Sequence, residues 1–145
     1  KLARISKTPG RTTEINFFEV EDGFKLLDLP GYGFAKSGRS RRKNWGPLLE
    51  EYFKNRQSLK AVLIFMDIRH PLKPIDLEMI KLCESFDIDY VVVLTKSDKV
   101  SKNISAKTIQ QVSEAINAKE ILVISSLNKK GFEKLRKVLI GFKYE

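Results

Sequence analysis

A short polar stretch follows one of the continuous apolar segments of the sequence. Residues 90–94 are all apolar or aromatic, and the run stops at Thr95, Lys96, Ser97 and Asp98. A carboxylate offers acceptor oxygens and no donor, so Asp98 suits a ligand that presents two adjacent N–H groups. Guanine presents such a pair in its ring N1–H and its exocyclic amine, whereas the matching edge of adenine does not. Taken alone, these four residues also fit an ordinary solvated turn.

A second polar turn follows a predicted hairpin. Two short apolar runs, residues 15–20 and 24–27, are joined through Asp22 and Gly23, which is a strong hairpin signal. The second run is followed by Asp28, Leu29, Pro30 and Gly31. In a phosphate site, Asp28 would hold a water of a bound Mg²⁺, and Gly31 would let its backbone N–H approach a terminal phosphate. The alternative is a strand that ends in a plain Pro-Gly turn.

Strands and helices alternate through most of the chain. Continuous apolar runs predict buried strands at residues 61–66, 90–94 and 121–124, and apolar residues at helical spacing predict helices within 45–53, 74–86, 109–116 and 132–142. This alternation predicts an α/β fold with a mostly parallel sheet, one antiparallel hairpin strand and helices on both faces. Parallel strands end at one edge of a sheet, so we expect Asp28, Asp67, Thr95 and Ser125 to converge there.

Composition narrows the class of protein. The 145 residues fit a single domain, 1–145, whose net charge of +9 suggests a polyanionic partner. The cluster Arg39, Arg41, Arg42 and Lys43 is a candidate contact for RNA phosphates, with a solvated loop as the alternative. No apolar run is as long as a membrane span, and the single cysteine suits a reducing compartment. We expect a cytoplasmic monomer without a membrane partner, in which Met66, Met79 and Cys83 fill the core and His70 has no catalytic role.

The motifs, in their order and spacing, resemble those of translation-factor-class GTPases. Switch I, switch II, the guanine-specificity loop and the last base loop are matched by Gly10-Arg11-Thr12, Asp28-Leu29-Pro30-Gly31, Thr95-Lys96-Ser97-Asp98 and Ser125-Ser126. Residues 7–12, 16–18, 30–36 and 66–71 are similar to the EngB-type ribosome-assembly GTPases, and the similarity covers essentially the whole chain. The resemblance implies a three-layer P-loop GTPase fold. It also implies a GTP-hydrolysing switch in assembly of the large ribosomal subunit that is needed for normal cell division and growth.

The same resemblance implies a role for individual residues. Thr12 would bind Mg²⁺ directly and contact the γ-phosphate, Asp28 would hold the metal through water, and Gly31 would sense the γ-phosphate. Asp98 would bind guanine, Lys96 would cover it, and the backbone around Ser125 would meet its O6. Thr95 replaces the Asn of many GTPases, and its hydroxyl can still tie the loop down. The implied GTP-binding set is Gly10, Arg11, Thr12, Thr13, Glu14, Asp28, Leu29, Pro30, Gly31, Thr95, Lys96, Ser97, Asp98, Ile124, Ser125 and Ser126.

Two departures from the GTPase pattern stand out. Tyr32 occupies the place where Ras-like enzymes carry the Gln that orients the attacking water, so no catalytic residue is assigned. We expect slow hydrolysis unless a partner, a monovalent cation such as K⁺ or another residue orients that water.

The second departure concerns the phosphate loop. The 145 residues contain no G-x-x-x-x-G-K-[ST] motif, which in the family accompanies the first, central strand. We expect these residues to be part of a longer natural protein and to be inactive by themselves. The alternative is a basic RNA- or ribosome-binding module on a degenerate GTPase scaffold without turnover.

Overall fold

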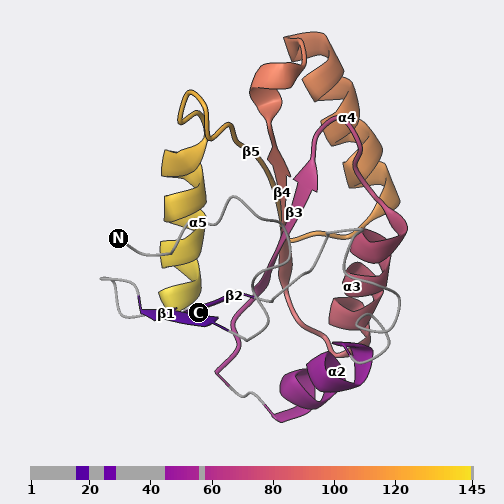
Figure 1. Ribbon diagram of the computed structural model, residues 1–145, viewed down its shortest axis with the longest axis vertical. Helices are drawn as coiled ribbons and strands as arrows, with labels where there is room; N and C mark the ends of the chain where they lie inside the picture. Colours follow the sequence, from indigo (N-terminus) through magenta and orange to yellow (C-terminus); the bar gives the residue numbers. More distant parts are fainter. Residues whose placement is uncertain (1–15, 20–24, 29–44, 56–57, 145) are drawn as a thin grey trace. The chain divides into compact units, whose positions relative to one another are not determined.

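The structure is a computed structural model that describes residues 16–19, 25–28, 45–55 and 58–144 (Figure 1). The chain falls into two compact units, Lys1–Asn55 and Arg56–Glu145. In the first unit, β1 (Asn16–Glu19) pairs antiparallel with β2 (Lys25–Asp28), with Asn16 opposite Asp28 and Glu19 opposite Lys25. The predicted hairpin pairing is therefore confirmed.

Helix α2 (Trp45–Asn55) completes the described part of the first unit. Leu49 and Phe53, four residues apart and thus on one face of the helix, are buried, whereas Glu50 and Glu51 are exposed. This pattern confirms the amphipathic helix that the sequence predicts.

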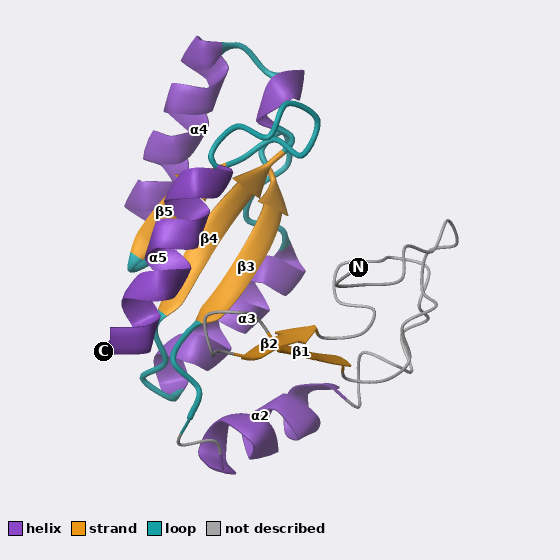
Figure 2. Cartoon of the chain, turned by 90° about the vertical axis from the view of Figure 1, so that its left-hand side faces the viewer, coloured by secondary structure: helices purple, strands orange, loops and turns teal. Residues whose placement is uncertain are grey.

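The second unit is built on a parallel three-stranded sheet in the order β3-β4-β5. Its elements are β3 (Val62–Asp67), α3 (Pro74–Ser85), β4 (Tyr90–Thr95), the short 3₁₀ turn η1 (Ser97–Lys99), α4 (Lys102–Ala115), β5 (Glu120–Val123) and α5 (Phe132–Tyr144). Helices α3 and α4 lie on one face of the sheet and α5 lies on the other (Figures 1 and 2). The predicted α/β architecture, with helices on both faces, is confirmed.

The central strand β4 forms the middle of this unit's core. Its residues from Val91 to Leu94 are fully buried. Val91 and Val93 share a core with Leu122 of β5, with Ile124, and with Leu135 and Phe142 of α5. Because side chains alternate along a strand, Val92 and Leu94 face the opposite layer. The remaining predicted core residues, Met66, Met79 and Cys83, are also buried, as expected.

The described strands form two sheets. Among them, β2 is hydrogen-bonded to β1 and β3 to β4, and no described strand joins the two pairs.

Candidate functional site

The polar turns of the second unit meet at one edge of its sheet. Asp67, the last residue of β3, lies opposite Thr95, the last residue of β4. Backbone hydrogen bonds link the turns beyond the strands, from Ile68 N to Thr95 O (3.1 Å) and from Ser97 N to Ile124 O (3.1 Å). The predicted convergence is therefore confirmed for the ends of β3, β4 and β5, where neighbouring parallel strands deliver three turns to one place.

Asp98 is joined to the turn after β5 by its side chain. Its Oδ1 accepts a hydrogen bond from the hydroxyl of Ser125 at 2.6 Å, and Lys99 Nζ lies 3.6 Å from Oδ2. The Ser125 hydrogen bond is the main reason that the pKa of Asp98 lies below its usual value, and Lys99 adds to the effect. Asp98 is thus ionised at neutral pH. A carboxylate has about four lone-pair positions, so one bond from Ser125 leaves capacity for further donors.

Lys96 is held at the same edge by Asp67. Its backbone is left-handed, with φ of 59°, and its Nζ lies 3.0 Å from Asp67 Oδ2. Arg69 donates two hydrogen bonds to the same carboxylate, from Nε to Oδ1 (2.9 Å) and from Nη2 to Oδ2 (2.7 Å). These contacts, with Arg69 the largest contributor, hold the pKa of Asp67 well below its ordinary range although burial acts against them. The Lys96 ammonium therefore has a fixed anchor, while more than half of its side chain stays exposed.

Thr95 secures the start of this loop. Its hydroxyl donates to the carbonyl oxygen of Met66 at 3.1 Å, across the β3–β4 pair. The expectation that this shorter side chain still ties the loop down is confirmed. In addition, Ser97 N donates to Ile124 O in the turn after β5. The backbone that carries Lys96 and Asp98 is therefore attached to β3 on one side and to the turn after β5 on the other.

The predicted phosphate and metal residues belong to the first unit, and most lie outside the described residues. These are Gly10, Arg11, Thr12, Thr13, Glu14, Leu29, Pro30 and Gly31, together with the basic cluster Arg39, Arg41, Arg42 and Lys43. Asp28 ends β2 opposite Asn16, so the strand that follows Thr12 in sequence runs beside the strand that carries Asp28. Within the described ranges, no group of three or more metal-ligating side chains is gathered. In the same ranges, no helix is long and apolar enough to cross a membrane.

Sequence reasoning missed the side-chain partners in this site. It placed Asp67 at the edge of the sheet but did not pair it with Lys96 or Arg69, and it gave Ser125 a backbone role, not a hydroxyl bond to Asp98. The sequence showed only that each of these residues comes at or after the end of a predicted strand. It could not pair their side chains, because the apolar pattern contains neither the strand register nor the side-chain rotamers.

Comparison with known proteins gives concordant matches. A family model described as "50S ribosome-binding GTPase" matches residues 1–96. The "Probable GTP-binding protein EngB" of Coxiella burnetii (strain RSA 331 / Henzerling II) is 45% identical over 142 residues, covering 95% of this chain and 69% of the relative. The protein of the same name from Salmonella paratyphi B is 45% identical over 142 residues, covering 95% and 68%.

Solved structures show the same fold. The crystal structure of a probable GTP-binding protein engB superimposes with a TM-score of 0.78 at 22% identity, covering 98% of this chain and 86% of that one. Era in complex with MgGDPNP and a segment of 16S ribosomal RNA gives 0.73 at 19% identity, covering 98% and 48%. At these identities the structures support the P-loop GTPase fold alone. The sequence matches go further, and on them the chain belongs to the EngB family of GTP-binding proteins.

Proposed function

We propose that this protein binds guanine nucleotides and hydrolyses GTP to GDP and phosphate as a conformational switch. The observation that carries the proposal is the 2.6 Å bond from Ser125 to Asp98, which presents an ionised carboxylate where the ends of β4 and β5 meet. In open α/β sheets, this edge is where ligands bind. Membership of the EngB family supports the same reading.

Selection of guanine follows from the chemistry of this edge. The free acceptor positions of Asp98 match the ring N1–H and the exocyclic amine of guanine. Adenine would leave the carboxylate unpaired, and a site built for hydrogen bonding strongly rejects a ligand that lacks the bond. The ammonium of Lys96 pairs with Asp67, and its aliphatic stem would pack against the flat face of the base.

For the phosphates we propose the residues that the sequence suggests. Thr12 and Asp28 would hold Mg²⁺, directly and through water, and Gly31 would contact the γ-phosphate. When bound, magnesium neutralises charge on the phosphate oxygens during transfer. Tyr32 follows Gly31 and has one hydroxyl, not the separate carbonyl acceptor and NH₂ donor of a glutamine amide. Intrinsic hydrolysis is therefore slow unless a partner or a cation such as K⁺ orients the water.

The proposed macromolecular partner is the large ribosomal subunit, during its assembly in the cytoplasm, as a step required for cell division. Support comes from the description of the matching family model and from the net charge of +9, which favours binding to a polyanion. Arg39, Arg41, Arg42 and Lys43 are the candidate contacts with ribosomal RNA.

Nucleotide selectivity is tested by titrating the full-length protein with a fluorescent GDP analogue in Mg²⁺. We expect saturable binding that GDP and GTP displace and ATP does not, together with slow release of phosphate from GTP. Equal displacement by ATP, or no saturable binding, would remove the GTPase proposal and leave a basic RNA-binding module without turnover.

The ribosomal contact is tested by charge reversal. Changing Arg39, Arg41 and Arg42 together to Glu should abolish salt-sensitive co-sedimentation with large subunits. The control reverses the exposed Lys60, Lys81 and Lys107 to Glu, which makes the same change in net charge elsewhere. Equal binding by the two triple variants would remove Arg39, Arg41 and Arg42 from the proposed contact.

A further inference from the structure

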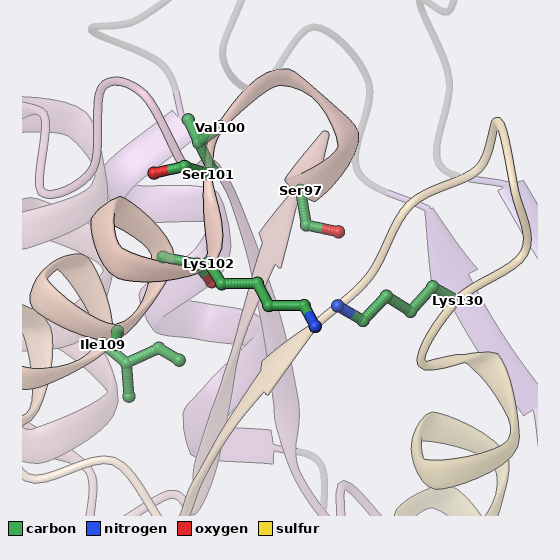
Figure 3. A pocket seen from close by; sticks show the side chains of 8 residues that line it. Ser97, Val100, Ser101, Lys102, Ile109 and Lys130 are labelled. Carbon is green, nitrogen blue, oxygen red and sulfur yellow. The ribbon is translucent and has the colours of Figure 1, made fainter.

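A small pocket lies beside the candidate site, within the second unit. It has a volume of about 210 Å³ and is lined by Ser97, Val100, Ser101, Lys102, Ser105, Ala106, Ile109 and Lys130 (Figure 3). Pockets for drug-sized ligands run from about 300 to 1,000 Å³, and a water molecule takes about 30 Å³ of the liquid. The pocket therefore suits a small hydrated ion. Of the guanine-specificity loop, only Ser97 lines it, so the pocket is distinct from the position proposed for the base.

Ser97, which lines this pocket, carries an unsatisfied hydrogen-bonding group. The residue is 9% exposed, and its hydroxyl oxygen is buried without a hydrogen-bond partner. A buried hydroxyl left unpaired costs about 1–3 kcal/mol. It is the sole such atom found in the described part of the chain, which singles out this position for a ligand.

The other groups at the pocket carry positive charge. Helix α4 begins at Lys102, after the N-cap Ser101, whose Oγ accepts from Ile104 N at 3.3 Å. The first N–H groups of a helix have no acceptor within the helix, so its N-terminus carries partial positive charge. The side chains of Lys102 and Lys130 point toward one another across the pocket (Figure 3). No carboxylate in the described ranges forms an ion pair with either lysine.

We propose that this pocket binds a phosphate group. The available donors come from three separate elements: the Ser97 turn, the start of α4 and the loop that carries Lys130. Donors that approach from several directions match a tetrahedral oxyanion, whose oxygens each accept hydrogen bonds, better than they match a planar carboxylate. A bound phosphate would satisfy Ser97 and separate two like charges. It would also bridge the loops after β4 and β5. The site does not depend on the proposed nucleotide function.

The site is tested by two-dimensional NMR of the ¹⁵N-labelled full chain. Sodium phosphate is added at constant ionic strength, balanced with sodium chloride. We expect saturable shifts of the amide signals of Ser97, Lys102, Asn103 and Lys130. Replacing either lysine (Lys102→Gln or Lys130→Gln) should raise the apparent Kd about two- to fivefold, as for a partly exposed charge contact, and the double variant should not saturate. The matched control is Lys107→Gln, an exposed α4 lysine that does not line the pocket.

Replacing Ser97 with Ala tests the role of the hydroxyl through the melting temperature, measured with and without phosphate. Without phosphate, the variant should melt at the same or a higher temperature, because the unpaired hydroxyl is gone. With phosphate, it should gain less in Tm than the unchanged protein, since at a given concentration a more weakly bound ligand stabilises the folded state less. A purely structural role for Ser97 would instead lower Tm by the same amount with and without phosphate, and would overturn the proposal.

Two further results would also overturn the phosphate-site proposal: amide shifts that rise linearly with phosphate without saturating, or equal weakening of phosphate binding by Lys107→Gln and Lys102→Gln.

A short single-stranded RNA is added to distinguish a free phosphate ion from a phosphodiester as the ligand. Shifts of the same amides at RNA concentrations below those needed for phosphate, lost on competition with phosphate, would identify a phosphodiester as the ligand. No response to RNA, beside a saturable response to phosphate, would identify the free ion.

Discussion

Replacing Asp98 with Asn tests the proposed base recognition at its centre. The change keeps the size of the side chain and removes its charge. In the structure, Ser125 donates to Oδ1, so an Asn at this position keeps that bond by placing its carbonyl oxygen there and its NH₂ group at the Oδ2 position. The NH₂ group then faces the base as a donor. One of the two guanine N–H groups loses its acceptor, while the other still has the amide oxygen.

The magnitude follows from this exchange. Losing a hydrogen bond to a charged acceptor weakens binding by about 10- to 150-fold, so the Kd for GDP should rise by that factor. Xanthine has a carbonyl in place of the exocyclic amine and would accept from the new NH₂ group. Xanthosine diphosphate should therefore bind the variant more tightly than it binds the unchanged protein.

The assay is displacement of a fluorescent GDP analogue by GDP and by xanthosine diphosphate, with Asp89→Asn as control. Asp89 precedes β4 at the end opposite to Asp98, its side chain is 51% exposed, and it pairs with Lys119 at 2.8 Å. The control should bind both nucleotides as the unchanged protein does. If Asp98→Asn left the GDP affinity unchanged, or weakened both nucleotides equally, Asp98 would not bind the base as proposed.

Three other predictions concern stability and reactivity. Gly131 has φ of 81°, and an added Cβ would collide with the carbonyl oxygen of Val123, so Gly131→Ala should lower the free energy of unfolding by about 2 kcal/mol or more in urea titrations. Gly141→Ala, at a helical glycine with open space around it, should raise that free energy by about 0.5–1 kcal/mol, and similar effects at the two glycines would contradict the reasoning. The lowered pKa of Asp67 means that its contribution is complete above the unfolded-state value near 4 and is lost as the pH falls below it. Asp67→Asn should thus be less stable at pH 7 and decline less between about pH 4 and pH 2, whereas parallel pH profiles would exclude this role. Burial raises the pKa of the Cys83 thiol to about 12, so a disulfide reagent at pH 8 should label the unfolded chain and spare the native one; rapid native labelling would show that the thiol is accessible.

The sequence by itself determined the order and type of the elements. The side chains of residues 90–94 are apolar apart from the Tyr90 hydroxyl, and three of them are valines, so the run favours a buried strand. Helical spacing of apolar residues leaves one face to cover the sheet. The positions of Asp67, Thr95 and Ser125 at one edge follow from the same pattern, since successive strands of a parallel sheet point the same way. Most strand and helix bounds differ from the predicted ones by one or two residues, but α4 begins at Lys102, seven residues before the predicted 109. Element ends are set by hydrogen bonds and caps that the apolar pattern does not contain.

Only the tertiary structure decided which side chains meet at that edge. The register that sets Asp67 opposite Thr95 brings Lys96 to the carboxylate that Arg69 contacts within the turn after β3. The 27-residue separation between Asp98 and Ser125 is closed by the packing of β5 against β4. The gathering of Ser97, Lys102 and Lys130 around one pocket has the same origin. Hydrophobic burial is periodic along the chain and can be predicted from short segments. A hydrogen bond or an ion pair instead requires two side chains to be placed within a few tenths of an ångström, and only the packed core places them there.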